Sequence, residues 1–193
     1  ESEIPKTTLT GRFGTYRTHA YELTNGAKIG WFNYFLSASN ANSQGARDNS
    51  NYKANTINGK IGLDIEEKNH FTLSGRLHQG ELGTPGPKTS FDIDDKQEDK
   101  QNYLNGIWES TFNDKLQLKL QGYMNLDRLE FTETVYPTLD KNTHQSKDRG
   151  LNLQSSYKVI KNTNLTLGIE GREFRLNSNT TGKRNATLRS IYA

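Results

Sequence analysis

The chain has 193 residues, a net charge of +3 and no cysteine. The small net charge and the lack of a basic cluster argue against nucleic acid as a partner, and the absence of cysteine excludes a disulfide framework and thiolate metal sites. Only 31% of the residues are hydrophobic and the mean hydropathy is −0.90, which fits either disorder or a sheet that is apolar on one face. An aromatic share of 10% and regular alternation favour the sheet.

Alternating apolar and polar residues predict about ten antiparallel strands along the chain. We expect them at 6–15, 17–24, 28–39, 55–66, 70–82, 102–112, 115–132, 149–159, 164–176 and 185–193. The segments "TNGAK", "EEKN", "FNDK" and "IKNT" have the composition of tight hairpin turns. Long polar segments lie between them, at 40–54, 83–101 and 133–148. Apart from a tight first bend near Gly14–Arg17, short and long connections alternate, which predicts an up-and-down meander with the long loops at one end.

Strand length and residue placement favour a membrane-spanning β-barrel. Several runs reach about ten residues, as a bilayer crossing requires, whereas strands in soluble proteins usually have about 5–6. Aromatic residues gather beside the short turns, as in the girdle at a membrane surface; these are Trp31, Phe32, Phe71, Phe112 and Tyr157. A soluble β-sandwich or lipocalin-like barrel, with the apolar rows turned inward, is the alternative.

The polar rows carry many charges, which predicts a wide barrel. The residues expected to point inward are Lys60, Asp64, Arg76, Lys119, Gln121, Asp127, Lys158, Glu170 and Arg172. An eight-stranded barrel is just filled by side chains, and an unpaired charge in a dry interior costs several kcal/mol. The strands are therefore expected to be an arc of a larger barrel. A small closed barrel with inward ion pairs is the alternative.

The chain resembles a TonB-dependent outer-membrane receptor, particularly of the cobalamin-receptor-like branch. The resemblance rests most on "GELGTPGP" (80–87), where the fifth strand enters its outer loop. The opening "TTLTGRFGTYRTHAYELTNGAKIGWF" is similar to the first barrel strands after the plug domain, and "LTLGIEGREFRLNSNTTGKRNATLRSIYA" is similar to a later hairpin. The whole of 1–193 resembles only the first part of such a barrel, without the plug, the TonB box or the remaining strands.

The resemblance implies a 22-stranded barrel in the outer membrane of a Gram-negative bacterium. It also implies a plug that contacts the TonB complex, and uptake of a bulky, scarce nutrient such as cobalamin or a ferric siderophore. The chain is then a fragment, a split subunit or the ordered part of a longer protein, and it is not expected to be an enzyme.

An acidic segment, "SFDIDDKQEDK" (90–100), is a candidate calcium site. Calcium prefers several carboxylate and carbonyl oxygens, and some cobalamin receptors bind it through outer-loop aspartates. The candidate ligands are Asp92, Asp94, Asp95 and Asp99. The segment lacks the glycine and the terminal glutamate of an EF-hand, and a solvated acidic loop is the alternative.

Candidate ligand-binding residues lie in or beside the long loops. Tyr52, Phe91 and Tyr136 are expected to pack on a bulky ligand; packing of the loops on one another is the alternative. His78 lies two residues from Arg76 and shares its side of the predicted strand, which is the polar one. It is expected to face either a ligand in the lumen or solvent.

Three other functions are alternatives to transport. A complete ten-stranded barrel would serve as an adhesin, an anchor or a pore. An outer-membrane hydrolase would place His78 within hydrogen-bond reach of a hydroxyl and a carboxylate; Ser74 is the neighbour in sequence that supplies a hydroxyl. A soluble β-sandwich would be a binding module.

Overall fold

The computed structural model describes residues 3–66, 68–86, 94–135 and 138–193, and within them all regular structure is β-strand. The strands are β1 (Lys6–Phe13), β2 (His19–Ile29), β3 (Phe32–Ser43), β4 (Tyr52–Ile65), β5 (Asn69–Gly83), β6 (Lys96–Thr111), β7 (Leu116–Val135), β8 (Thr138–Ile160), β9 (Thr163–Ser178) and β10 (Gly182–Tyr192). The described residues include no helix that could cross a membrane.

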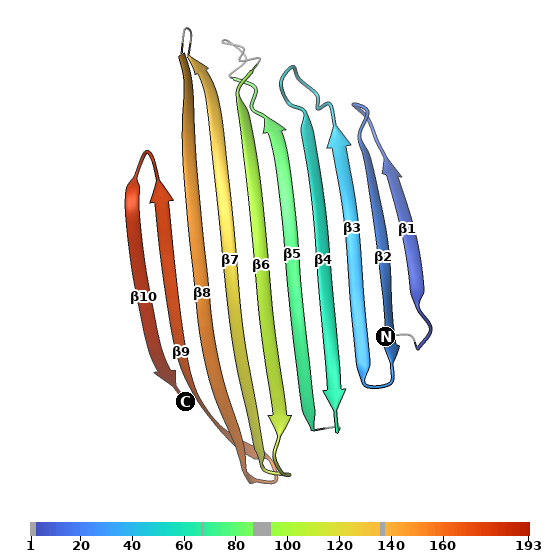
Figure 1. Ribbon diagram of the computed structural model, residues 1–193, viewed down its shortest axis with the longest axis vertical. Coiled ribbons are helices and arrows are strands. Elements are labelled where there is room, and N and C mark those ends of the chain that lie inside the picture. The colour runs from blue at the N-terminus through green and yellow to red at the C-terminus, as the bar shows by residue number, and fades with distance from the viewer. Residues whose placement is uncertain (1–2, 67, 87–93, 136–137) are drawn as a thin grey trace.

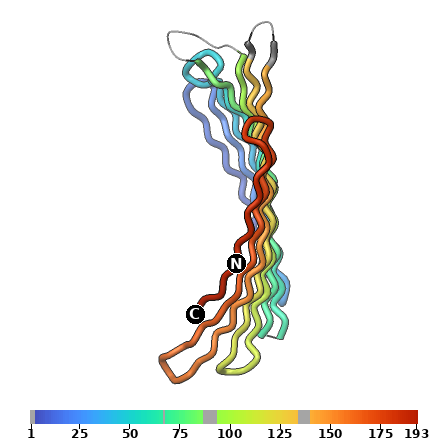
Figure 2. Tube along the Cα trace, turned by 90° about the vertical axis from the view of Figure 1, so that its left-hand side faces the viewer, coloured from blue at the N-terminus to red at the C-terminus, as the bar shows by residue number. Residues whose placement is uncertain are grey.

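All strands belong to one antiparallel sheet in the order β1 to β10 (Figure 1). Each strand is bonded to its neighbour in the chain, so the all-β up-and-down fold predicted from the sequence is confirmed. β1 and β10 form the two edges, and the described residues do not pair them with each other. Figure 2 shows that this single layer is curved rather than flat.

The pairing register sorts side chains into one apolar face and one polar face. Ile61 lies opposite Tyr34 on one side and Leu73 on the other, while its neighbour Lys60 lies opposite Phe35 and Ser74. Continued across the sheet, the register places every residue that we expected to point inward on the face of Lys60, called the polar face below.

The described residues form no second layer over the apolar face, so they do not support the soluble-sandwich alternative. Among the described hydrophobic residues only Ala27 and Ala54 are buried, whereas Ile57 is 55% exposed and Leu167 is 49% exposed. In water such a continuous apolar surface would be unfavourable, at roughly 25 cal/mol for each Å². In a bilayer the same rows are in contact with acyl chains.

The apolar residues form a band of membrane height, called the apolar band below. In β7 it runs from Leu116 to Leu126 on the apolar face, and the next residues of that parity are Arg128 and Glu130. This part of the strand is roughly 33 Å long at about 3.3 Å per residue, and about 25 Å high when a strand is tilted by about 40°. Beyond the apolar band this face carries charged and polar side chains, and we call this part of the strands the outer extension.

Two predicted connections are wrong. "TNGAK" is strand, because Asn25 and Gly26 pair with both β1 and β3; the turn lies instead at Gly30 and Trp31, where Gly30 has a φ of 59°. The predicted loop 133–148 is almost entirely strand, since β7 ends at Val135 and β8 begins at Thr138. The strict alternation of short and long connections therefore fails at this hairpin. The sequence of this hairpin has the composition of a loop because neither face of the outer extension needs apolar side chains.

Candidate ligand-binding face

His78 is the centre of a three-strand cluster on the polar face. Its Nδ1 lies 2.8 Å from the Thr56 hydroxyl of β4, and its Nε2 lies 3.0 Å from Oδ2 of Asp99 in β6. The side chain of His78 is 13% exposed. Thr56 is directly opposite His78, but Asp99 is opposite Gly80, so the carboxylate reaches His78 along a diagonal.

Gly80 makes this diagonal contact possible. A Cβ at position 80 would lie 2.7 Å from Oδ1 of Asp99, which is closer than a carbon and an oxygen that are not covalently bonded normally approach. The missing side chain leaves the space that the carboxylate occupies. Thr56 and Gly80 were not singled out from the sequence, because their roles depend on the register between strands rather than on a local motif.

The cluster has the hydroxyl–imidazole–carboxylate order expected of a hydrolase, with Thr56 rather than Ser74 as the hydroxyl. A hydroxyl nucleophile also needs hydrogen-bond donors that stabilise the developing oxyanion. Thr56 lies in a strand that is paired on both sides, so its flanking backbone amides are used in the sheet. The arrangement therefore fixes the orientation of His78, and the described part of the chain adds no backbone oxyanion site around Thr56.

Ion pairs order the rest of the polar face. Near the short turns, Asp64 accepts hydrogen bonds at 2.8 Å from Lys28 and at 2.8 Å from His70 Nδ1. Toward β9, Asp148 accepts a two-pronged bond from Arg172, with distances of 2.8 Å and 2.5 Å. Such pairs hold long polar side chains in fixed positions, which suits a face that contacts another polar surface or a solute.

Tyr52 and the outer loops lie at one end of this face. Tyr52 begins β4 and is partly exposed. The Asn49 amide donates to the Asp95 carbonyl at 2.8 Å, and Arg47 Nη2 donates to the Gly86 carbonyl at 2.6 Å. The loops therefore do pack on one another here. Phe91 and Tyr136 lie outside the described residues.

The structure separates the aspartates of the candidate calcium site, as far as they are described. Asp99 is directed to His78, Asp95 is buried at the base of the loop, and Asp92 lies outside the described residues. Within the described ranges no group of three or more acidic or histidine side chains is placed to hold a metal ion. Calcium binding stays a prediction.

Comparison with known proteins identifies the fold. No family model and no curated protein matches the sequence. Among solved structures, FpvA of Pseudomonas aeruginosa in complex with an iron-loaded heterologous pyoverdine superimposes with a TM-score of 0.71 and 12% identity, over 90% of this chain and 28% of that one. The ferripyoverdine receptor of the P. aeruginosa outer membrane, bound to ferripyoverdine, gives a TM-score of 0.47 and 11% identity, over 98% of this chain and 39% of that one. The copper transporter OprC gives a TM-score of 0.47 and 12% identity, over 97% of this chain and 40% of that one.

The FpvA match shows the fold class alone. The ten strands of the single antiparallel sheet superimpose on part of FpvA. The chain spans about a quarter to two-fifths of the length of these structures. Their names mention pyoverdine and copper, so the cobalamin-receptor-like branch stays a prediction.

Proposed function

We propose that the chain is part of the wall of a TonB-dependent receptor in the outer membrane of a Gram-negative bacterium. The observation that carries the proposal is a single curved sheet with a membrane-high apolar band on one face and ordered ion pairs on the other. A face of this kind suits a lumen that holds a polar plug. A complete ten-stranded barrel is less well supported, because it would pair β1 with β10, and the described residues do not.

We further propose uptake of a bulky, scarce nutrient, either a ferric siderophore or cobalamin. Residues 1–193 would supply one partial barrel domain, and the plug and the remaining strands would come from elsewhere in the receptor. Tyr52, Phe91 and Tyr136 would contact the ligand from the outer loops, and His78 would contact it from the polar face. Calcium bound by Asp92, Asp94, Asp95 and Asp99 would order the loop, and it would draw Asp99 away from His78. The TonB complex would act through the plug.

Uptake into cells tests this proposal. The full polypeptide would be expressed in a Gram-negative strain that lacks its own siderophore and cobalamin receptors, with and without a functional TonB protein. We expect accumulation of a labelled ferric siderophore or of labelled cobalamin in the TonB-containing cells only. If the protein reaches the outer membrane and neither class accumulates, the transport proposal is wrong. Heat-dependent gel migration of the 193-residue chain alone would favour the small closed barrel.

A further inference from the structure

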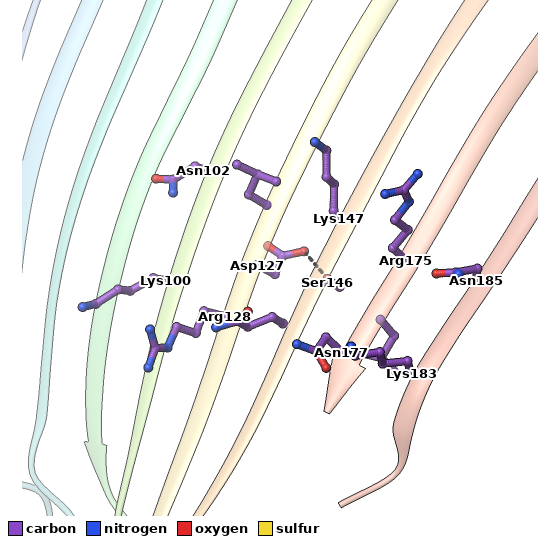
Figure 3. Close-up of a pocket in the computed structure, with 13 residues that line it drawn as sticks. Lys100, Asn102, Asp127, Arg128, Ser146, Lys147, Arg175, Asn177, Lys183 and Asn185 are labelled. Atoms are coloured by element: carbon purple, nitrogen blue, oxygen red, sulfur yellow. Dashed lines mark hydrogen bonds between the residues drawn. The ribbon is translucent and has the colours of Figure 1, made fainter. Parts of the chain in front are cut away.

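A cluster of basic side chains lies on the apolar face directly above the apolar band. It consists of Lys100, Arg128, Lys147, Arg175 and Lys183, which we call the cationic patch. These residues come from consecutive strands, β6 to β10, and Figure 3 shows them gathered over one part of the sheet. They surround a depression of about 570 Å³, whose floor includes Leu126, the last apolar residue of the band in β7.

The register places like charges directly opposite each other. Lys100 faces Arg128 across β6 and β7, and Lys147 faces Arg175 across β8 and β9. Directly opposed like charges destabilise a sheet. Lys183 lies at the end of the row of Arg128 and adds a third positive charge to it. The other residues of these two ladder rows on this face are uncharged, and they include Asn102, Gln145, Asn177 and Asn185. An anion between the rows would remove the repulsion and would accept hydrogen bonds from the amides.

The chain itself neutralises only part of this charge. Arg128 donates to Glu130 at 2.7 Å, and Arg175 Nε donates to Glu173 at 2.5 Å. Among the described residues, Lys100, Lys147 and Lys183 have no ion-pair partner. The Asp127 carboxylate, although it borders the depression, belongs to the polar parity and is bonded to Asn125 and Ser146. The patch therefore keeps a net positive charge that an external anion can neutralise.

We propose that the cationic patch binds the phosphate groups of an anionic lipid headgroup in the adjacent membrane leaflet. Height on the sheet selects this occupant. In β7 Arg128 directly follows Leu126 on this face, and in β8 and β9 the ion pair of Arg149 and Glu173 lies between the apolar residues and the patch. The patch therefore lies at the border of the apolar band, which is where headgroups lie when the band contacts acyl chains. Clustered Lys and Arg beside a membrane-spanning segment attract anionic lipid. The inference rests on the membrane orientation in the proposed function, but it does not depend on transport or on the transported ligand.

Lipid retention in detergent tests the inference. The full polypeptide would be purified in dodecyl maltoside, mixed with lipid A, which carries two phosphates, and observed by native mass spectrometry. The test variant combines Lys100→Gln, Lys147→Gln and Lys183→Gln. We expect its apparent affinity for lipid A to fall about tenfold or more. The wild-type protein should lose lipid A at high salt, and it should bind dephosphorylated lipid A weakly.

A matched control removes the same charge from elsewhere. Lys158→Gln, Lys161→Gln and Arg184→Gln lie in a turn or on the polar face, and this variant should retain lipid A within about twofold of the wild type. Equal retention of lipid A by the test variant and the control variant would overturn the inference. Binding of inorganic phosphate to the wild-type protein as strong as its binding of lipid A would also overturn it. A change in oligomeric mass with unchanged lipid retention would assign the patch to a second copy of the chain and would also overturn it. Failure of the wild-type protein to fractionate with the outer membrane would instead contradict the proposed function.

Discussion

The ring of Tyr123 in β7 lies against Gly150, the residue directly opposite it in β8. A Cβ at position 150 would be only 2.5 Å from the ring. The Tyr123 hydroxyl donates to Asp148 at 3.3 Å, and Asp148 in turn binds Arg172 of β9. The packing of Tyr123 on Gly150, the hydrogen bond to Asp148 and the ion pair with Arg172 thus connect β7, β8 and β9 on the polar face.

Gly150→Ala should destabilise the barrel, because the new methyl group displaces the Tyr123 ring and its bond to Asp148. Overpacking of this kind costs about 1–3 kcal/mol. The measurement is urea unfolding of the full polypeptide in lipid vesicles. Gly171→Ala is the matched control, since a Cβ at position 171 meets nothing within 4 Å and should leave the free energy of unfolding within about 0.5 kcal/mol. Equal effects of the two substitutions would contradict the contact.

His78 and Asp99 should show a favourable coupling energy. The variants His78→Gln and Asp99→Asn, alone and combined, form a double-mutant cycle for unfolding in vesicles. We expect a coupling of about 0.5–1 kcal/mol, since the pair is partly exposed. Gly80→Ala should remove most of the coupling, because its methyl group occupies the position of the Asp99 carboxylate. A coupling that survives Gly80→Ala would show that the diagonal contact does not depend on the glycine.

Acid should loosen the tip of the β7–β8 hairpin in the outer extension. Lys141 and Arg128 bind the Glu130 carboxylate, which is 9% exposed, and they hold its pKa below the ordinary value of 4.5. The carboxylate therefore contributes stability above pH 4.5, and this contribution is lost as the pH falls through the lowered pKa. Protection factors of the amides around Glu130, which correct for the intrinsic slowing of amide exchange in acid, should fall on acidification over that window. Glu130→Gln should exchange faster at neutral pH and should lack this acid dependence; an unchanged acid dependence would contradict the assignment.

A charge on the apolar face should be costly, whereas the same charge on the polar face should not. Leu120→Arg places the charge within the apolar band, and a mid-membrane Arg on the lipid side of a barrel costs about 2–4 kcal/mol. Gln121→Arg, one residue further along β7, is the control and should cost less than about 1 kcal/mol. Unfolding in vesicles compares the two. The assignment of the faces would be wrong if Gln121→Arg had the larger cost.

The sequence predicts the sheet well wherever one face is apolar. Ile57, Ile61 and Leu63 alternate with polar residues, and period-2 alternation arises only when the two faces meet different surroundings. Residues 133–148 are mostly polar at both parities, so they carry no alternation, and the sequence predicts a loop there. "TNGAK" failed for a different reason: its Asn-Gly pair is a common hairpin signal, but strand pairing on both sides overrides it here.

The functional clusters were less predictable than the strands. His78 was a candidate from its parity, but its contacts with Thr56 and Asp99 need the register of three strands. The cationic patch likewise draws one residue from each of five strands, so its members are far apart in sequence. Register is set by all the pairings together, and a single-strand pattern does not contain it.

Alternating spin labels along β8 test most directly which face of the sheet contacts lipid. Single cysteines would replace Leu151, Asn152, Leu153 and Gln154 in turn, in the full polypeptide without other cysteines, reconstituted in vesicles. Nitroxides at 151 and 153 should be relaxed strongly by oxygen, which concentrates in the bilayer, and those at 152 and 154 by a water-soluble nickel chelate. The opposite alternation, or uniform access of the nickel chelate to all four positions, would contradict the account.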